Sequence, residues 1–282
     1  MHESVTIPGS VLFCTGLAGI ACAALPVAAA LRLYKKMGTA PAAFFWGCGA
    51  YLILPLMLGQ TLSGLAGLLP FSGTLWFAVV YSALSVALLN LAARLAVFHW
   101  ALKDDRSLPN AVQFGLGFGW TDALLLLAID LIFTTALGLA INRDPAAFAA
   151  LGNEEMLTAL TAQLNGVKVG PMLASAAERL CAVVMQAALA VLMMVGVGRR
   201  RPLFTLAAFG LEAACLAALV WLGEITGSSL LSLAVRVVFT AAAVLLAMYS
   251  KKIWDETDAP ITGASAGKTQ TWNAPLRRRP LD

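Results

Sequence analysis

The chain has 282 residues, of which 60% are hydrophobic and 12% are charged, and its mean hydropathy is +0.83. A soluble domain of this length cannot bury so much apolar surface, so the composition excludes a soluble globular protein and predicts an integral membrane protein. The net charge of +4 comes from cations in loops beside hydrophobic runs, without interleaved aromatic residues, so nucleic acid is not an expected partner.

Hydrophobic runs long enough to cross about 30 Å of hydrocarbon occur seven times along the chain. They predict an all-α bundle of about seven transmembrane helices that occupies residues 1–249 and has the lipid bilayer as its surroundings. The fourth run is longer than a membrane requires, so its helix is expected to be tilted, broken or partly cytosolic. The runs cover residues 10–33, 43–69, 74–102, 110–141, 172–198, 203–222 and 230–249.

The positions of the 19 lysines and arginines predict the orientation, because positively charged loops are retained on the cytoplasmic side. Only Arg143 and Lys168 fall in loops on the opposite side. The N-terminus is therefore expected outside and the C-terminus in the cytoplasm, in a bacterial plasma membrane. The cations on the cytoplasmic side follow the first, third, fifth and seventh runs: Arg32, Lys35, Lys36, Lys103, Arg106, Arg199, Arg200, Arg201, Lys251, Lys252, Lys268, Arg277, Arg278 and Arg279.

Two segments outside the spans have distinct compositions. In the external connection at 142–171, Glu154 and Glu155 precede an apolar stripe at helical spacing, which predicts a short amphipathic helix. That helix either packs on the bundle or forms a lid over a substrate site. The segment 250–282 loses its hydrophobicity and ends in an arginine run, which predicts a disordered cytoplasmic tail.

Metal ligands are scarce in the sequence. The five cysteines fall inside the predicted spans and form no CxxC pair. His2 lies at the external terminus and His99 near the cytoplasmic end of the third span, so the histidines are not spaced to share a metal with the cysteines. The sequence therefore predicts no metal site, and no cofactor is expected.

Polar residues from three separate spans are expected at one depth in the membrane. Asn90, Asp122 and Gln186 each lie about twelve residues from the cytoplasmic end of their run, about 18 Å at 1.5 Å per residue. Polar groups in hydrocarbon are costly, so this layer indicates a shared interior site. It contains one carboxylate and no histidine.

Charged residues flank this polar layer. Arg94 lies four residues after Asn90, so the two side chains share a helical face. Glu178 shares a face with Gln186 two turns later, and it could neutralise either Arg94 or its neighbour Arg179. Each of these groups could instead serve only to hold helices together.

Glycines precede the aspartate of the layer. Gly115 and Gly119 form a small-xxx-small pair in the fourth run, before Asp122, and such a pair permits close approach of a neighbouring helix.

Three short patterns in segments 81–127 and 177–199 carry a family resemblance. They read N-L-A-A-R from Asn90, G-L-G-F-G-W-T-D from Gly115, and E-R-L-C-A-V-V-M-Q from Glu178. These patterns resemble E-E-x-x-R, G-x-G-H-G-x-x-E and E-R-x-x-A-x-x-x-H of the YhfC-type intramembrane peptidases, a branch similar to the CPBP or Abi glutamic intramembrane proteases. The first two spans also fit, so the resemblance covers most of the chain before the tail.

The resemblance implies a protease-like fold whose expected catalytic residues are replaced. The two glutamates of the first pattern are Asn90 and a leucine, and Phe118 stands in place of histidine in the second. Asp122 replaces a glutamate, Gln186 replaces a histidine, and the later helix has Glu212 and no histidine. Peptide hydrolysis needs a base, an acid and a stabiliser for the oxyanion or a metal. Asparagine and leucine cannot serve as the base, and glutamine and phenylalanine cannot titrate near neutral pH or supply a nitrogen ligand to zinc.

These replacements favour a pseudoprotease over an enzyme. Such a protein would bind or chaperone a transmembrane segment or hydrophobic peptide through its polar cavity. One alternative is an active peptidase with Asp122 as acid and base, helped by Glu178 or Glu212. A second alternative is a transporter or small-molecule-binding membrane protein. The expected binding residues are Asn90, Arg94, Phe118, Asp122, Glu178, Arg179, Gln186 and Glu212.

Overall fold

The computed structural model describes residues 7–144 and 154–258. Within those ranges seven helical segments are long and apolar enough to cross a membrane, and no strand occurs, which confirms the predicted all-α membrane bundle. The predicted orientation of the termini stays a prediction. The spans are α1 (Gly9–Met37); α2 (Pro41–Tyr51), η1 (Leu52–Leu58) and α3 (Gly59–Ala66); α4 (Leu75–Ala96) and η2 (Val97–Ala101); α5 (Leu108–Ala123), η3 (Leu124–Ala128) and α6 (Ile129–Arg143); α9 (Val169–Gly198); α10 (Pro202–Thr226); and α11 (Ser229–Asp258).

The second, third and fourth spans each contain a π-helical stretch, namely η1, η2 and η3. In η1, Pro55 has no backbone N–H to donate, which removes one helical hydrogen bond and favours a local change of helix type. The long fourth span is not interrupted by a loop, because η3 joins α5 to α6 as one continuous helix. A π-helical stretch shifts the register of the residues after it, and such stretches often occur beside functional groups.

Helix α9 is the centre of the bundle. It packs against α1, α5, α10 and α11, and every residue from 187 to 196 is buried. These residues are alanine, valine, leucine, methionine and glycine, so they fill the interior without adding polar groups that need partners. Helix α9 can therefore present the few polar side chains of its first half to several neighbouring helices at once.

Glycines set the distance between α5 and its two neighbours. A Cβ atom on Gly115 would lie 2.5 Å from the Ala187 Cα on α9, and one on Gly119 would lie 2.8 Å from the Val183 Cα. This result confirms the close helix approach that the small-xxx-small pair predicted. The opposite face of α5 meets the backbone of α2, where a Cβ on Gly117 would collide with the Phe44 carbonyl.

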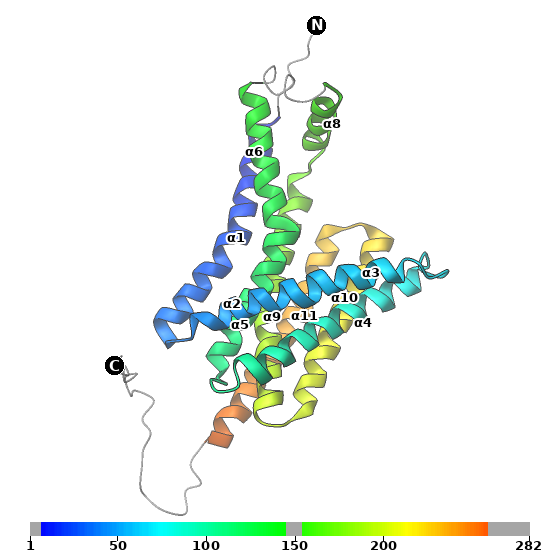
Figure 1. Ribbon diagram of the computed structural model, residues 1–282. Coiled ribbons are helices and arrows are strands. Elements are labelled where there is room, and N and C mark those ends of the chain that lie inside the picture. Colours follow the sequence, from blue (N-terminus) through cyan, green and yellow to red (C-terminus); the bar gives the residue numbers. More distant parts are fainter. Residues whose placement is uncertain (1–6, 145–153, 259–282) are drawn as a thin grey trace, which may run out of the picture.

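Helices α1 and α6 lie side by side at one end of the molecule, while α2, α3 and α4 extend away from them (Figure 1). The predicted connection at 142–171 contains helix α8 (Glu154–Asn165). Leu164 of α8 is buried in a cluster with Ile7, Leu12 and Ile141, at the end of the α1–α6 pair. This placement favours a helix packed on the bundle over a lid on a substrate site.

The predicted tail begins later than expected. Helix α11 continues through Asp258, so the prediction of a disordered segment from residue 250 is wrong for residues 250–258. In that stretch, the Arg199 guanidinium lies over the Trp254 ring, 4.2 Å from the ring centre. This contact holds the polar end of α11 against the bundle. Residues 259–282 of the predicted tail lie outside the described residues.

Candidate functional site

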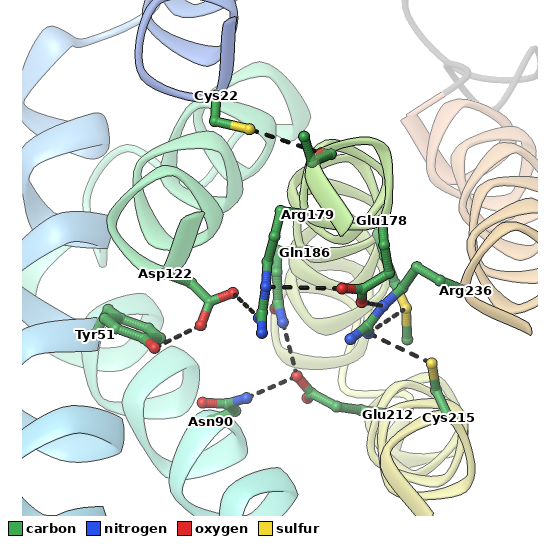
Figure 2. Close-up of polar contacts among 12 residues, drawn as sticks. Cys22, Tyr51, Asn90, Asp122, Glu178, Arg179, Gln186, Glu212, Cys215 and Arg236 are labelled. Atoms are coloured by element: carbon green, nitrogen blue, oxygen red, sulfur yellow. Dashed lines mark hydrogen bonds and ion pairs between the residues drawn. The ribbon is translucent and has the colours of Figure 1, made fainter. Parts of the chain in front are cut away.

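A cavity of about 290 Å³ lies between α3, α4 and η3 on one side and α9, α10 and α11 on the other. Asn90, Asp122 and Gln186 all line it, so the polar layer predicted from their depths converges on one interior space. Figure 2 shows these side chains directed toward a common region from different helices. The lining residues are Tyr51, Pro55, Leu56, Gly59, Gln60, Ser63, Ser85, Val86, Leu89, Asn90, Asp122, Leu126, Arg179, Ala182, Gln186, Glu212, Leu216 and Arg236.

Glu212 on α10 is the acceptor at the bottom of the cavity. Its side chain is 2% exposed, and one carboxylate oxygen accepts hydrogen bonds from the Asn90 amide at 2.8 Å and the Gln186 amide at 3.0 Å. Arg94 donates to both carboxylate oxygens, at 2.6 and 3.0 Å. A buried carboxylate requires such compensation, so these bonds hold α4, α9 and α10 in one register.

Arg94 contacts a carboxylate, an amide and an aromatic ring, although its buried Nε has no hydrogen-bond partner among the described residues. Its side chain is 1% exposed, it also donates to the side-chain Oε1 of Gln186, and its guanidinium lies over the Phe118 ring at 5.2 Å from the ring centre. The ring in turn packs edge-to-face against Tyr51, with 5.2 Å between the ring centres. Phe118 thus does not line the cavity itself but packs against Arg94 and Tyr51.

Asp122 on α5 forms a second polar group in the cavity. The Tyr51 hydroxyl donates to one carboxylate oxygen at 2.5 Å, and Arg179 on α9 donates to the other at 3.3 Å. Tyr51 ends α2 immediately before η1, and Asp122 lies two residues before η3. Two π-helical stretches therefore begin beside this contact, where the second and fourth spans exchange a hydrogen bond.

Glu178 and Arg236 form the third polar group, between α9 and α11. The Arg236 Nε donates to Glu178 at 2.7 Å, and Arg179 lies 3.7 Å from the other carboxylate oxygen of Glu178. Arg236 also donates to the Cys215 sulfur at 3.4 Å. Figure 2 shows this group adjoining the Asp122 contact through Arg179.

The predicted residues divide into two sets. Five of them line the cavity, and the other three, Arg94, Phe118 and Glu178, lie behind the lining and hold it in place. The predicted pairing of Glu178 with Arg94 is wrong, because Arg94 binds Glu212, whereas the pairing of Glu178 with Arg179 is present. The lining set is Asn90, Asp122, Arg179, Gln186 and Glu212.

Tyr51 and Arg236 bind carboxylates of the site and were not among the predicted residues. Arg236 is an arginine inside the seventh span, and the rule that marked Arg94 as functional would have marked it too. Tyr51 has no such signal, because a tyrosine in an apolar run is common. Its role follows from the close contact of α2 with α5, which sequence spacing does not reveal.

Replacing Tyr51 with phenylalanine is expected to lower the free energy of unfolding by about 1.5 kcal/mol, because the Asp122 carboxylate loses a buried donor. Unfolding of the purified chain in detergent measures the change. Tyr81→Phe is the matched control, since Tyr81 stacks on Phe77 and has no hydrogen bond from its hydroxyl to any described residue. Equal effects of the two changes would contradict the assigned contact.

Comparison with known proteins supports the resemblance read from the three patterns. The family model described as YhfC intramembrane metalloprotease matches residues 21–250, which is most of the chain and includes every residue of the site. Searches of curated proteins and of solved structures each found no match. The description of the family as intramembrane agrees with the seven apolar spans. The chain therefore belongs to the YhfC intramembrane metalloprotease family.

Proposed function

We infer that this protein does not hold the catalytic metal that its family description implies, because the residues of the site do not fit one. A catalytic zinc takes about three protein ligands from histidine, carboxylate or thiolate. No group of three or more such residues comes together in the part of the chain that the structure describes. His99 lies outside the cavity lining, with its ring nitrogen 2.9 Å from the Leu95 carbonyl oxygen.

The carboxylates of the site are already bound by cations. Arg179 contacts Asp122, Arg236 contacts Glu178, and Arg94 contacts Glu212. A general base must be free to accept a proton from water during hydrolysis, whereas each of these carboxylates already accepts a hydrogen bond or ion pair from a guanidinium. The amides of Asn90 and Gln186 cannot take the proton either. The polar groups of the site therefore suit binding better than hydrolysis.

We propose that this YhfC-family membrane protein is a pseudoprotease, which binds or chaperones a transmembrane segment or hydrophobic peptide through its cavity. The observation that carries the proposal is the pairing of each carboxylate of the site with an arginine, around a space that stays open. The fold of a protease is kept because it receives a peptide. Hydrolysis is absent because each carboxylate that would move a proton is bound to an arginine.

The cavity has the chemistry to receive a polar section of a membrane peptide. Its rim includes the exposed Gln60 and Ser63, and the partly exposed Arg179 lies farther in. At the bottom, the Asn90 side-chain oxygen accepts no hydrogen bond from any residue that the structure describes. Unpaired backbone groups cost several kcal/mol each in hydrocarbon, so such a surface would shelter a break in a helix.

The size of the cavity limits what enters it. Its volume of about 290 Å³ is near the lower end of the range of about 300–1,000 Å³ for ligand pockets. A whole helix does not fit. The proposed occupant is therefore one polar side chain or a short unwound turn, while the rest of the segment lies along the lipid-facing surface of α3 and α4.

Crosslinking from the cavity wall tests this function. Benzoylphenylalanine at Val86, which lines the cavity, is expected to give a discrete adduct with a membrane polypeptide, mapped by mass spectrometry to an intact hydrophobic segment. The same probe at Leu88, which is exposed on the same helix and does not line the cavity, should give no such adduct. Ser85→Leu narrows the cavity and should weaken the adduct about tenfold, whereas Ser82→Leu should not.

Other results would replace this function with an alternative. If the crosslinked segment is cleaved, and if Asp122→Asn stops the cleavage, the protein is an active peptidase. If proteoliposomes show substrate-dependent flux that Ser85→Leu blocks, the protein is a transporter. An equal set of adducts from Val86 and Leu88 would show that the cavity selects no partner.

A further inference from the structure

A second and larger hollow lies at the end of the bundle where the cations cluster. It has a volume of about 740 Å³ and is bounded by the last residues of α1, the start of α5, the second half of α9 and the end of α11. On α9 its wall is the stripe Val184, Ala187, Ala188 and Val191. Spacings of three and four residues place this stripe on one face of the helix. We refer to this hollow as the basal groove.

The basal groove is separate from the polar cavity. Gln186 and Ala182 of α9 face the cavity, and the 3.6-residue period of a helix directs the groove stripe to the opposite face of α9. Variants that fill one space therefore leave the lining of the other unchanged.

The groove changes from apolar to basic along its length. On α11 the wall runs from Val244 through Met248 to Lys251, and Arg106 faces it from the segment before α5. Arg106 uses its Nε to donate to the Phe98 carbonyl at 3.1 Å. In residues 7–144 and 154–258, neither Lys251 nor the terminal nitrogens of Arg106 form an ion pair with a carboxylate.

The remaining polar groups at this end leave a net positive charge. Asp255 also lines the groove, so its carboxylate offsets one of the two cations. Trp254 lines the groove as well, and tryptophan is typical of the membrane–water interface. An apolar wall that ends in an indole and in two cations without an ion-pair partner among the described residues matches an acyl chain that ends in an anionic phosphate.

The length of the apolar wall favours a bound lipid over a bound transmembrane helix. From Val184 to Val191, and likewise from Val244 to Lys251, the wall extends about 10 Å at 1.5 Å per residue. A transmembrane helix would need about 30 Å of apolar contact. The first part of an acyl chain, adjoining its headgroup, needs only the shorter distance.

We infer that the basal groove is a binding site for one anionic phospholipid of the surrounding bilayer. Its acyl chain lies along the α9 stripe, and its phosphate lies between Arg106 and Lys251. The charge bias of the loops explains both cations only as markers of orientation, and this site gives them a ligand. The site does not depend on the proposed function of the polar cavity.

Native mass spectrometry of the full chain in detergent tests the site, with dioleoyl phosphatidylglycerol and dioleoyl phosphatidylcholine as probes. Wild-type protein is expected to retain one phosphatidylglycerol in preference to phosphatidylcholine. Arg106→Gln with Lys251→Gln should weaken phosphatidylglycerol binding about tenfold. Lys36→Gln with Lys103→Gln removes the same charge from exposed positions that do not line the groove, and should change it little.

A variant that fills the groove and photolabelling of the wild-type protein complete the test. Val184→Trp places a large ring in the groove and should reduce the binding of both lipids. Phosphatidylglycerol with a diazirine on its acyl chain should label wild-type peptides from α9 and α11. Equal retention of the two lipids, equal effects of the two double variants, or labelling confined to other helices would overturn the site.

Discussion

Arg94→Met is expected to lower the free energy of unfolding by about 3–5 kcal/mol. The change leaves the Glu212 carboxylate, which is 2% exposed, without its cation. The remaining donors, the amides of Asn90 and Gln186, carry no charge to offset it. Steric trapping or denaturant unfolding in detergent measures the loss. Arg32→Met, at an exposed position on α1, is the control and should change stability by less than about 0.5 kcal/mol.

The double variant Arg94→Met with Glu212→Met separates the cost of an orphaned charge from the value of the pair. Buried ion pairs replaced by apolar groups of similar volume are often neutral in stability, so the double variant should recover most of the loss. The double-mutant cycle then gives a coupling energy between the two residues. Additive losses would contradict the pairing that joins α4 to α10 in the structure.

Gly115→Ala is expected to destabilise the bundle by about 3 kcal/mol, although alanine favours a helix over glycine. The new Cβ would lie 2.5 Å from the Ala187 Cα, so α5 and α9 must move apart. Because Asp122 on α5 contacts Arg179 on α9, this movement should also weaken crosslinking from the cavity. The same unfolding measurement reports the stability change.

Gly49→Ala is the matched control for the glycine substitution. Gly49 lies on α2, and a Cβ at this position would have no neighbour within 4 Å among the described residues. Its helix propensity improves without a collision, so the variant should be neutral or stabilised by up to about 1 kcal/mol. Equal behaviour of the two variants would show that α5 and α9 tolerate a wider separation than the structure has.

The polar cavity and the ion pairs around it have separate tasks. The pairs Arg94–Glu212 and Glu178–Arg236 join α4 to α10 and α9 to α11, and one member of each pair, Glu212 and Arg236, also lines the inner part of the cavity. Removing them should reduce stability first. The lining groups nearer the rim, such as Ser85, should affect the proposed binding with little loss of stability, because they form no ion pair.

Much of the site can be predicted from the sequence, because a charged residue deep inside an apolar run is costly and therefore stands out. Arg94 and Asp122 were marked by their position inside apolar runs, and Gly115 by its spacing to Gly119. The partner of Arg94 was not accessible. The sequence offers Glu178 as a possible partner, and only the rotation of each helix about its axis decides that Glu212 meets the arginine instead.

The sequence by itself determined the seven spans, the family and the common depth of Asn90, Asp122 and Gln186, because hydropathy and residue spacing act locally along one helix. Only the tertiary structure decided the ion-pair partners, the role of Tyr51 and the basal groove. These features depend on how helices distant in sequence are rotated and spaced against one another. Glycine contacts and π-helical register changes set that geometry, and hydrophobic periodicity does not report it.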